Sequence, residues 1–381
     1  MAVIIQKKAQ DYQDPLTSFS YALKAPETKR QYPRRFKVFL DFLELEGSFK
    51  EQATEFLTRT TQDQRWAEDS LMKFIDFQKV RCDRKEISES TVPNYYKATK
   101  LFCDMNDLIL NWKKIARGLP RGRKAADDRA PTLQEIQKLL EYPDRRIKPI
   151  VTCMVSGGFR LGSWDFLQWK HVTSVKDKDG NIVAAKFVIY PGDQEEYYTF
   201  VTTEAFTALK DWMDFRAEYG EEITGESWLM RDLWQTSNMK YGAKFGLATM
   251  PRPLKSSAIK RLIERALWEQ GIRKPLLPGS NRHEWKAAHG FRKYYKSHAE
   301  QVMRPINVEL TMGHNLGVSK SYWKPTESEV LEDYLKAVDE LTIDVDQNML
   351  QKQVAKLEQK RKDSEYIIEG RLQKKTGRST S

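Results

Sequence analysis

Apolar residues in the first third of the chain recur at helical spacing and predict a small all-helical domain. Tyr32, Phe36 and Phe39 lie about one turn apart, which places their side chains on one face of a helix. Further helices are expected where the same period returns. The predicted helices cover residues 28–45, 62–80, 91–105 and 108–116. They define a domain at residues 27–116, preceded by a polar N-terminal arm at residues 1–26.

The second half of the chain mixes helical periodicity with two strand-like segments. Residues 182–190 and 196–201 are rich in β-branched and aromatic side chains and flank the turn sequence PGDQE, which predicts a β-hairpin. Capping boxes begin helices at Thr132 and at Thr326. Other helices are predicted at residues 203–219, 256–270 and 285–300. We therefore expect an α+β domain at residues 132–343, mainly α-helical with a small antiparallel hairpin or sheet.

Residues 117–131 separate the two domains and lack apolar periodicity. Glycine and proline mark the segment as a linker, and its basic residues give two interpretations: a solvated hinge, or a strap that lies along a phosphate backbone. The basic residues of this linker are Arg117, Arg121, Arg123, Lys124 and Arg129. At the other end of the chain, residues 344–381 form a polar tail that is expected to be helical and partly disordered.

The composition points to a polyanionic partner. The 64 lysines and arginines exceed the 53 acidic residues, for a net charge of +11, which points to a polyanionic partner such as double-stranded DNA, with a basic but inert surface as the alternative. No apolar run approaches the ~20 residues of a membrane span, and no signal peptide is recognisable, so a cytoplasmic, DNA-associated protein is expected. The 3 cysteines and 5 histidines show no metal-ligand spacing, and no cofactor is predicted.

A set of polar residues suits phosphodiester chemistry. Arg160 follows an apolar segment, His289 and Arg292 are three residues apart, and His314 precedes Tyr322 by eight residues. Arginine donates paired hydrogen bonds to phosphate oxygens, histidine exchanges protons, and a tyrosine hydroxyl can attack phosphorus. Each residue alone has a commoner explanation, such as a helix-terminal arginine, a histidine in a turn or a tyrosine in a core.

Together these residues resemble the tyrosine recombinase, or phage-integrase, family, and most closely its archaeal integrases. The segments GGFRLGSWDFLQW, HGFRKYY and MGHNLGVSKSYW carry the resemblance, which covers nearly the whole chain. It implies a two-domain, C-shaped clamp with a helical core-binding domain and an α+β catalytic domain. It also implies a metal-independent integrase that cuts and rejoins DNA through a 3′-phosphotyrosyl intermediate.

The resemblance also implies a role for each residue of the set. Tyr322 is the expected nucleophile, and Arg160 and Arg292 are expected to hold the scissile phosphate. His289 is the expected general base or hydrogen-bond donor, and His314 should bind a non-bridging oxygen. Lys255 and Lys260, near the start of a predicted helix, are further candidate DNA contacts.

Three departures from the family pattern keep alternatives open. Ser163 stands where an acidic residue is usual, and Asp165 is a candidate substitute for orienting Arg160. The interval from the third-segment histidine to the tyrosine is one residue short, which leaves Tyr334 as a competing nucleophile. The hairpin turn lacks the family's general-acid lysine. Lys186 in the first strand is the nearest candidate, with an ordinary solvent-facing lysine as the alternative.

Two further expectations concern partners and a rival function. An amphipathic helix after Tyr322 implies docking on a neighbouring protomer and a homotetramer on DNA, although the helix could instead pack within its own chain. The rival function is a non-catalytic DNA-binding protein derived from an integrase, which Ser163 and the absent hairpin lysine favour.

Overall fold

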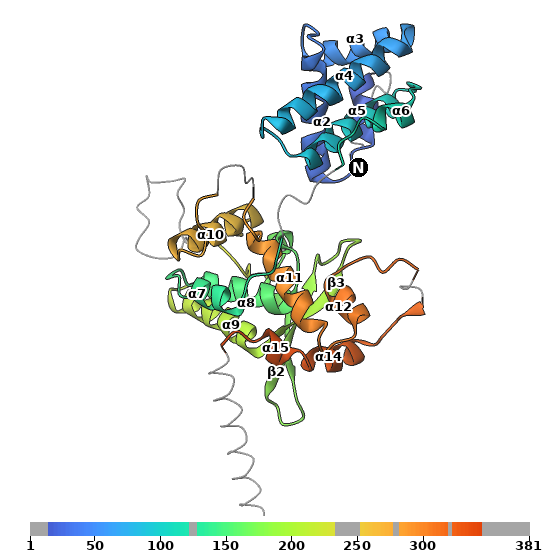
Figure 1. Ribbon diagram of the computed structural model, residues 1–381. Coiled ribbons are helices and arrows are strands. Elements are labelled where there is room, and N and C mark those ends of the chain that lie inside the picture. Colours follow the sequence, from blue (N-terminus) through green and yellow to red (C-terminus); the bar gives the residue numbers. More distant parts are fainter. Residues whose placement is uncertain (1–13, 122–127, 233–251, 277–281, 319–321, 345–381) are drawn as a thin grey trace, which may run out of the picture. The chain divides into compact units, whose positions relative to one another are not determined.

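A computed structural model describes residues 14–121, 128–232, 252–276, 282–318 and 322–344. The chain divides into two compact units, one formed by Met1–Ala126 with Leu276–Arg282 and the other by Asp127–Pro275 with His283–Ser381. Both are mainly helical, and the second contains a three-stranded antiparallel sheet (Figure 1). The predicted fold class is therefore confirmed in its helical content and its small sheet. In the described ranges, no helix is long and apolar enough to cross a membrane.

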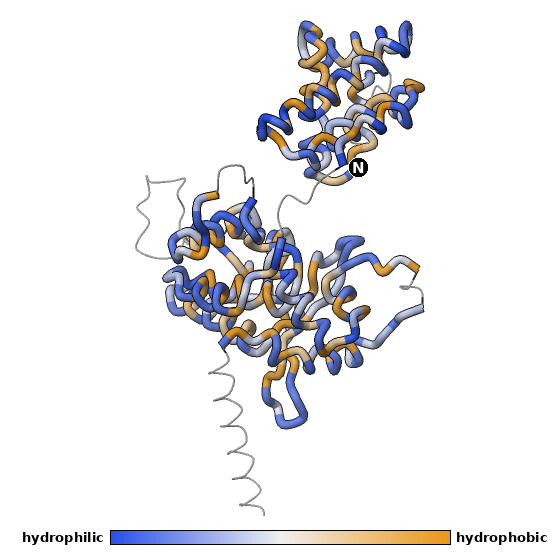
Figure 2. The backbone as a smooth tube through the Cα atoms, viewed as in Figure 1, coloured by the Kyte–Doolittle hydropathy of each residue, from blue (hydrophilic) through white to orange (hydrophobic). Residues whose placement is uncertain are grey.

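The first unit is a helical bundle around an aromatic core. Phe36 stacks on Phe102 with ring centroids 4.1 Å apart, and Phe39 meets Phe56 edge to face at 5.3 Å. Hydrophobic and hydrophilic residues alternate along these helices in Figure 2, as expected when one face of each helix is buried. Its α-helices are α1 (Pro15–Tyr21), α2 (Pro26–Phe42), α3 (Phe49–Gln62), α4 (Gln64–Asp83), α5 (Val92–Met105) and α6 (Trp112–Ala116).

Helix α1 lies within the range predicted as a polar arm, so that prediction is wrong from residue 14 onward. Asp14 caps the helix by accepting from the Leu16 backbone N–H. Phe19 is fully buried and lies 5.8 Å from the rings of both Phe36 and Phe102. A helix of 7 residues, about two turns, offers too few apolar positions for a period to be visible, although the burial of Pro15 and Phe19 anchors it.

Helix α3 was not predicted. Threonines at positions 54, 58, 60 and 61 lower its helix propensity, and their hydroxyls donate to the carbonyl oxygens one turn earlier. A readable signal was present nevertheless, because Ser48 and Glu51 form a capping box. Burial of Ala53 and Phe56 then supplies the tertiary contacts that the local sequence lacks.

The second unit packs helices against the sheet. Strands β2 and β3 pair antiparallel with Lys186 opposite Phe200, which confirms the predicted hairpin, and β1 adds an unpredicted third strand on the other side of β2. The strands are β1 (Val172–Lys176), β2 (Ile182–Ile189) and β3 (Tyr197–Thr202). The α-helices are α7 (Leu133–Leu140), α8 (Ile147–Gly157), α9 (Thr203–Glu218), α10 (Ser256–Glu269), α11 (Ala287–Ala299), α12 (Pro305–Thr311), α14 (Glu327–Leu335) and α15 (Val338–Leu341).

Helix α8 is the central element of this unit. Every residue from Pro149 to Gly157 is buried, and the helix contacts α7, α9, α11 and β3. A helix that is apolar on all sides must be surrounded by other elements. Its C-terminal end is therefore held rigidly, and that end leads directly to Arg160.

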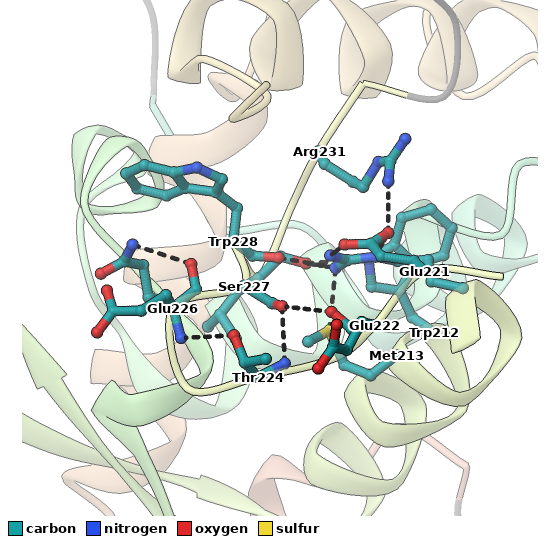
Figure 3. A network of polar contacts seen from close by, with 12 residues as sticks. Trp212, Met213, Glu221, Glu222, Thr224, Glu226, Ser227, Trp228 and Arg231 are labelled. Atoms are coloured by element: carbon teal, nitrogen blue, oxygen red, sulfur yellow. Dashed lines mark hydrogen bonds and ion pairs between the residues drawn. The ribbon is translucent and has the colours of Figure 1, made fainter. Parts of the chain in front are cut away.

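A buried ion network fixes the segment between α9 and α10 (Figure 3). The Glu221 carboxylate pairs with Arg216 and with Arg231, whose side chains are 0% and 1% exposed. Arg216 also donates to the Trp228 carbonyl oxygen over 2.7 Å. Removing the carboxylate would take away the negative charge that Arg216 and Arg231 share, and loss of one partner from a buried ion pair is strongly destabilising. The network attaches residues 221–231 to α9, and the Leu254 N–H donates to the Met230 carbonyl just before α10 begins.

Candidate active site

Arg160 lies just beyond the end of α8. Gly158 ends that helix with φ +60°, and a Cβ atom there would lie 2.2 Å from the Tyr295 ring, so only glycine fits. The chain then turns, and both terminal nitrogens of Arg160 donate to the Gly313 carbonyl oxygen at 3.4 Å. The first of the three sequence segments is thus joined to the third, although the two partners are 153 positions apart in the sequence.

Arg292 connects all three segments. It lies on α11 and is only 5% exposed. Its guanidinium donates to the carbonyl oxygens of Gly158 and Met312. Burial lowers the pKa of Arg292. The neighbouring Tyr197 opposes this shift, whereas the positive charge of Arg160 lowers the pKa further. Arg160 contacts the carbonyl oxygen of Gly313 and Arg292 that of the preceding residue, Met312. The two guanidinium groups therefore concentrate positive charge at one place, where an anion can bind.

His314 follows α12 at a tight turn. Gly313 has φ +64°, and a Cβ atom on it would lie 2.3 Å from the Tyr197 ring. The turn places Nε2 of His314 at 2.7 Å from Nη2 of Arg292, while Nδ1 contacts the Glu309 carboxylate. The structure therefore brings Arg160, Arg292 and His314 together around the Gly313 turn.

His289 lies one helical turn before Arg292 on α11, and its side chain is exposed. Partial burial lowers its pKa below the ordinary value; Asp128 opposes the shift, and Lys286, Lys293 and Arg292 reinforce it. A histidine with a lowered pKa is neutral near pH 7. The neutral imidazole can accept a proton, which is the form a general base requires.

Tyr322 is not in contact with this cluster. Its side chain is 86% exposed, and within the part of the chain that the structure describes its phenol makes no hydrogen bond. The next residue, Trp323, donates to Asn307 Oδ1 over 3.1 Å, near the N-terminal end of α12, whereas His314 follows its C-terminal end. A seven-residue helix is about 10 Å long. The described residues between α12 and α14, on either side of positions 319–321, extend outward from the other elements of this unit (Figure 1).

Tyr334, the competing nucleophile, is fully buried. Its hydroxyl donates to the Ser156 carbonyl over 2.9 Å, and burial raises its pKa well above the ordinary value. A phenol in this environment cannot reach a DNA phosphate without disruption of the core. Of the two candidate nucleophiles, the exposed Tyr322 is therefore favoured over the buried Tyr334.

The two substitutes suggested for missing family residues have other partners. Asp165 accepts from the backbone N–H and the hydroxyl of Ser256 at 2.6 and 3.0 Å. It caps α10 and does not bind Arg160, so the predicted orienting role is wrong. Lys186 forms an ion pair with Glu327 at the start of α14 and lies 5.4 Å from the Tyr198 ring centroid. It is therefore neither a free strand lysine nor in contact with the arginines.

Arg129, from the predicted basic strap, is held by two carboxylates. Glu135 and Glu284 lie 2.7 and 2.8 Å from its guanidinium nitrogens. These ion pairs raise the pKa of Arg129, with Glu135 making the larger contribution. The pairing attaches the end of the linker to α7 and favours a structural role for this arginine.

The other candidate DNA contacts differ in what the structure says of them. Four of them are exposed, as a side chain that contacts a phosphate must be. Two lie outside the described residues. One of the exposed four, Lys260, also has a distant ion-pair partner, Glu264 at 3.7 Å. The exposed residues are Arg117, Arg121, Lys255 and Lys260, and those outside the described ranges are Arg123 and Lys124.

The helix proposed to dock on a neighbouring protomer is α14, and its apolar face is already covered. Val330 and Tyr334 are fully buried in a cluster with Phe200, Tyr295 and Val308 of the same chain. The alternative of packing within its own chain therefore describes α14. The polar tail at residues 344–381 lies outside the described residues except for Asp344.

Two neighbours of the cluster were not anticipated. The Tyr197 phenol lies next to Arg292 and Arg160, and burial raises its pKa. Glu309 contacts His314 through its carboxylate. No spacing rule could have found either residue, because α12 ends between Glu309 and His314 and because Tyr197 reaches the site from a strand.

Comparison with known structures supports the fold. A lambda integrase dimer bound to a COC′ core site is similar with a TM-score of 0.52 and 12% identity, over 83% of this chain and 98% of that chain. The XerA recombinase structure gives a TM-score of 0.34 at 17% identity, covering 85% of this chain and 98% of that one. No protein-family model and no curated protein sequence matches the chain. At 12% identity the likeness to lambda integrase concerns the fold alone.

Proposed function

We propose that this protein is a site-specific DNA recombinase of the tyrosine-integrase type, which cuts and rejoins DNA through a 3′-phosphotyrosyl intermediate. The observation that carries the proposal is the convergence of Arg160, Arg292 and His314 at the Gly313 turn, on a fold similar to that of lambda integrase. The resemblance of the three sequence segments to archaeal integrases suggests the same class.

The cluster has the chemistry that phosphoryl transfer needs. The reaction depends on positioning and on stabilising charge on the non-bridging oxygens, and Arg160 and Arg292 supply donors of fixed charge. The Tyr322 oxygen forms a bond to phosphorus, and the 5′ oxygen of the next nucleotide leaves and takes up a proton. Attack by a 5′ hydroxyl on the phosphotyrosine reverses these steps, so the strand is rejoined without an added energy source.

Tyr322 has to approach the cluster for this reaction. Neutral His289 is a candidate acceptor of the phenol proton. Gly317 has φ +57° with no atom within 4 Å of a Cβ built on it, so the segment before Tyr322 contains one uncrowded position at which the backbone can change direction. Ion pairing with Glu327 would have to break before Lys186 could act as the proton donor to the leaving oxygen.

DNA binding is proposed from charge and exposure. The net charge of +11 and the exposed Arg117, Arg121 and Lys255 suit contacts with phosphates, which position a protein without reading sequence. We also propose assembly as a homotetramer on DNA, through surfaces other than the covered face of α14.

The rival, a non-catalytic DNA-binding protein derived from an integrase, has two observations in its favour. Ser163 is buried, and its hydroxyl has no hydrogen-bond partner in the described structure, so it does not replace the missing acidic side chain. Lys186 is paired with Glu327. A test of catalysis is therefore also the test that separates these two functions.

The test traps covalent protein–DNA adducts. Nicked duplexes with randomised flanking sequence are incubated with the full-length protein, because the target site is unknown, and adducts are isolated under denaturing conditions and sequenced. The wild-type protein and Tyr334→Phe should both form adducts, whereas Tyr322→Phe should form none. Adducts with Tyr322→Phe would overturn the nucleophile, and no adducts with any protein, alongside salt-sensitive DNA binding, would favour the rival.

A further inference from the structure

His314 lies between an arginine and a carboxylate, and this arrangement determines where its proton is. Nε2 is 2.7 Å from Nη2 of Arg292. An arginine side chain has only donors, so Nε2 must accept and the ring proton must be on Nδ1. The Glu309 carboxylate contacts Nδ1 and accepts that proton's hydrogen bond.

Glu309 is itself held in place from α11. Its other oxygen pairs with Lys296, which is also 3.1 Å from Glu300. Burial opposes ionisation of Glu309, but hydrogen bonds from Lys296 and His314 outweigh it and keep the pKa of the carboxyl below its ordinary value. Glu309 is thus an anion at neutral pH.

The contacts form a closed chain between two helices. It begins at Lys296, passes through Glu309 and His314, and returns to Arg292, which lies one turn before Lys296 on α11. Residues four apart share one face of a helix. The charged groups around His314 are therefore Glu309 from α12, Arg292 and Lys296 from α11, and Arg160, which donates to the carbonyl of the preceding residue.

We propose that Glu309 is a positioning residue, which holds Nδ1–H of His314 so that Nε2 faces the scissile phosphate beside Arg292. This inference rests on the proposed function. When a phosphate oxygen takes the donors of Arg292, Nε2 is released from its role as acceptor. Nε2 can then take a proton from solvent and donate it in a hydrogen bond to a non-bridging oxygen, and the Glu309 carboxylate balances the resulting imidazolium charge.

The alternative is that Glu309 only connects α12 to α11 through Lys296. A matched control separates the two roles, because Glu300 pairs with the same lysine but does not touch His314. Glu309→Gln keeps the size of the side chain and removes its charge, Glu309→Met removes the acceptor, and Glu300→Gln removes only the second partner of Lys296.

The first readout is the tautomer of His314 and the hydrogen bond of its Nδ1–H, independent of any activity. Full-length protein labelled with ¹⁵N at its 5 histidines gives long-range ¹H–¹⁵N spectra, and His314→Asn identifies the His314 signals. Arg292 keeps the proton on Nδ1 in every variant, so the chemical shift of that proton reports on Glu309. We expect a strongly downfield Nδ1–H resonance, as a hydrogen bond to a carboxylate gives, in the wild type and in Glu300→Gln, and an upfield shift in Glu309→Met. An unchanged Nδ1–H shift in a folded Glu309→Met protein overturns the proposal.

The second readout is the rate of adduct formation in a single turnover. Glu309→Gln should be slower by about 10- to 100-fold, the range found when the carboxylate behind a metal-ligating histidine is lost, and Glu300→Gln should match the wild type. Equal slowing in both variants overturns the proposal in favour of a structural role. Failure of the proposed function would appear differently, as adducts in Tyr322→Phe or none in any protein, with the tautomer result unaffected.

Discussion

The indole nitrogen of Trp323 donates to Oδ1 of Asn307 over 3.1 Å, and this bond holds the neighbour of Tyr322 at the N-terminal end of α12. Arg304 adds to it, with its guanidinium carbon 5.7 Å from the indole ring centroid. The contacts of Trp323 with Asn307 and Arg304 therefore keep Tyr322 in a position away from the arginine cluster.

Weakening this attachment should increase catalysis. Trp323→Phe keeps an aromatic ring under Arg304 and removes the donor, at a cost of about 1 kcal/mol for one hydrogen bond. If the bond belongs to a resting position, the fraction of Tyr322 near the cluster rises, and single-turnover cleavage should increase about five-fold. Slower cleavage by a folded Trp323→Phe protein would show instead that the bond belongs to the productive position.

Gly313 should tolerate no side chain. Gly313→Ala would place Cβ at 2.3 Å from the Tyr197 ring at φ +64°, which combines overlap with backbone strain and should cost about 2 kcal/mol or more in unfolding free energy. Gly317→Ala is the matched control, with φ +57° but no atom within 4 Å, and should cost about 1 kcal/mol. Urea unfolding measures both, and equal losses would contradict the close packing.

The acid side of the rate–pH profile should respond to Asp128. Its charge opposes the lowering of the His289 pKa, so Asp128→Asn removes a stabiliser of the imidazolium and lowers that pKa further. If neutral His289 is the base, activity is lost as pH falls through this pKa, and the loss should move to lower pH in the variant. Cleavage rates between about pH 5 and pH 8 measure it; a shift to higher pH would exclude this role.

Lys186 and Glu327 should behave as a pair. If the lysine only attaches β2 to α14, Lys186→Met and Glu327→Gln should each cost about 0.2–1 kcal/mol of stability, since both side chains are partly exposed, and cleavage should be little changed. We expect this result. A fall of about 100-fold or more in Lys186→Met alone would identify the lysine as the proton donor.

The sequence was most informative where one local signal determined one element. The capping boxes at Thr132 and Thr326 mark the starts of α7 and α14, and two β-branched segments around a turn form the hairpin. Helix α3 was missed because its threonines obscure the apolar periodicity, and α1 because its 7 residues are too few to show one. Tertiary contacts stabilise both, and such contacts leave no regular pattern in the sequence.

At the candidate site, sequence order identified residues but not their partners. Arg160, Arg292 and His314 meet as the three segments implied. Asp165 caps α10 instead of orienting Arg160, because both of its carboxylate oxygens accept hydrogen bonds from Ser256. The contact between Glu309 and His314 could not be predicted from the sequence. His314 lies beyond the end of α12, and the direction of a side chain after a helix end does not follow from residue spacing.

The burial of α14 within its own domain limits how far the phenol can travel. Glu327 at the helix start comes five positions after Tyr322, and that connection spans at most about 18 Å when fully extended. We therefore expect each subunit to use its own tyrosine, in cis, with its own arginines. Mixing Tyr322→Phe protein with Arg292→Ala protein should then give no complementation, in contrast to enzymes whose subunits exchange the nucleophile.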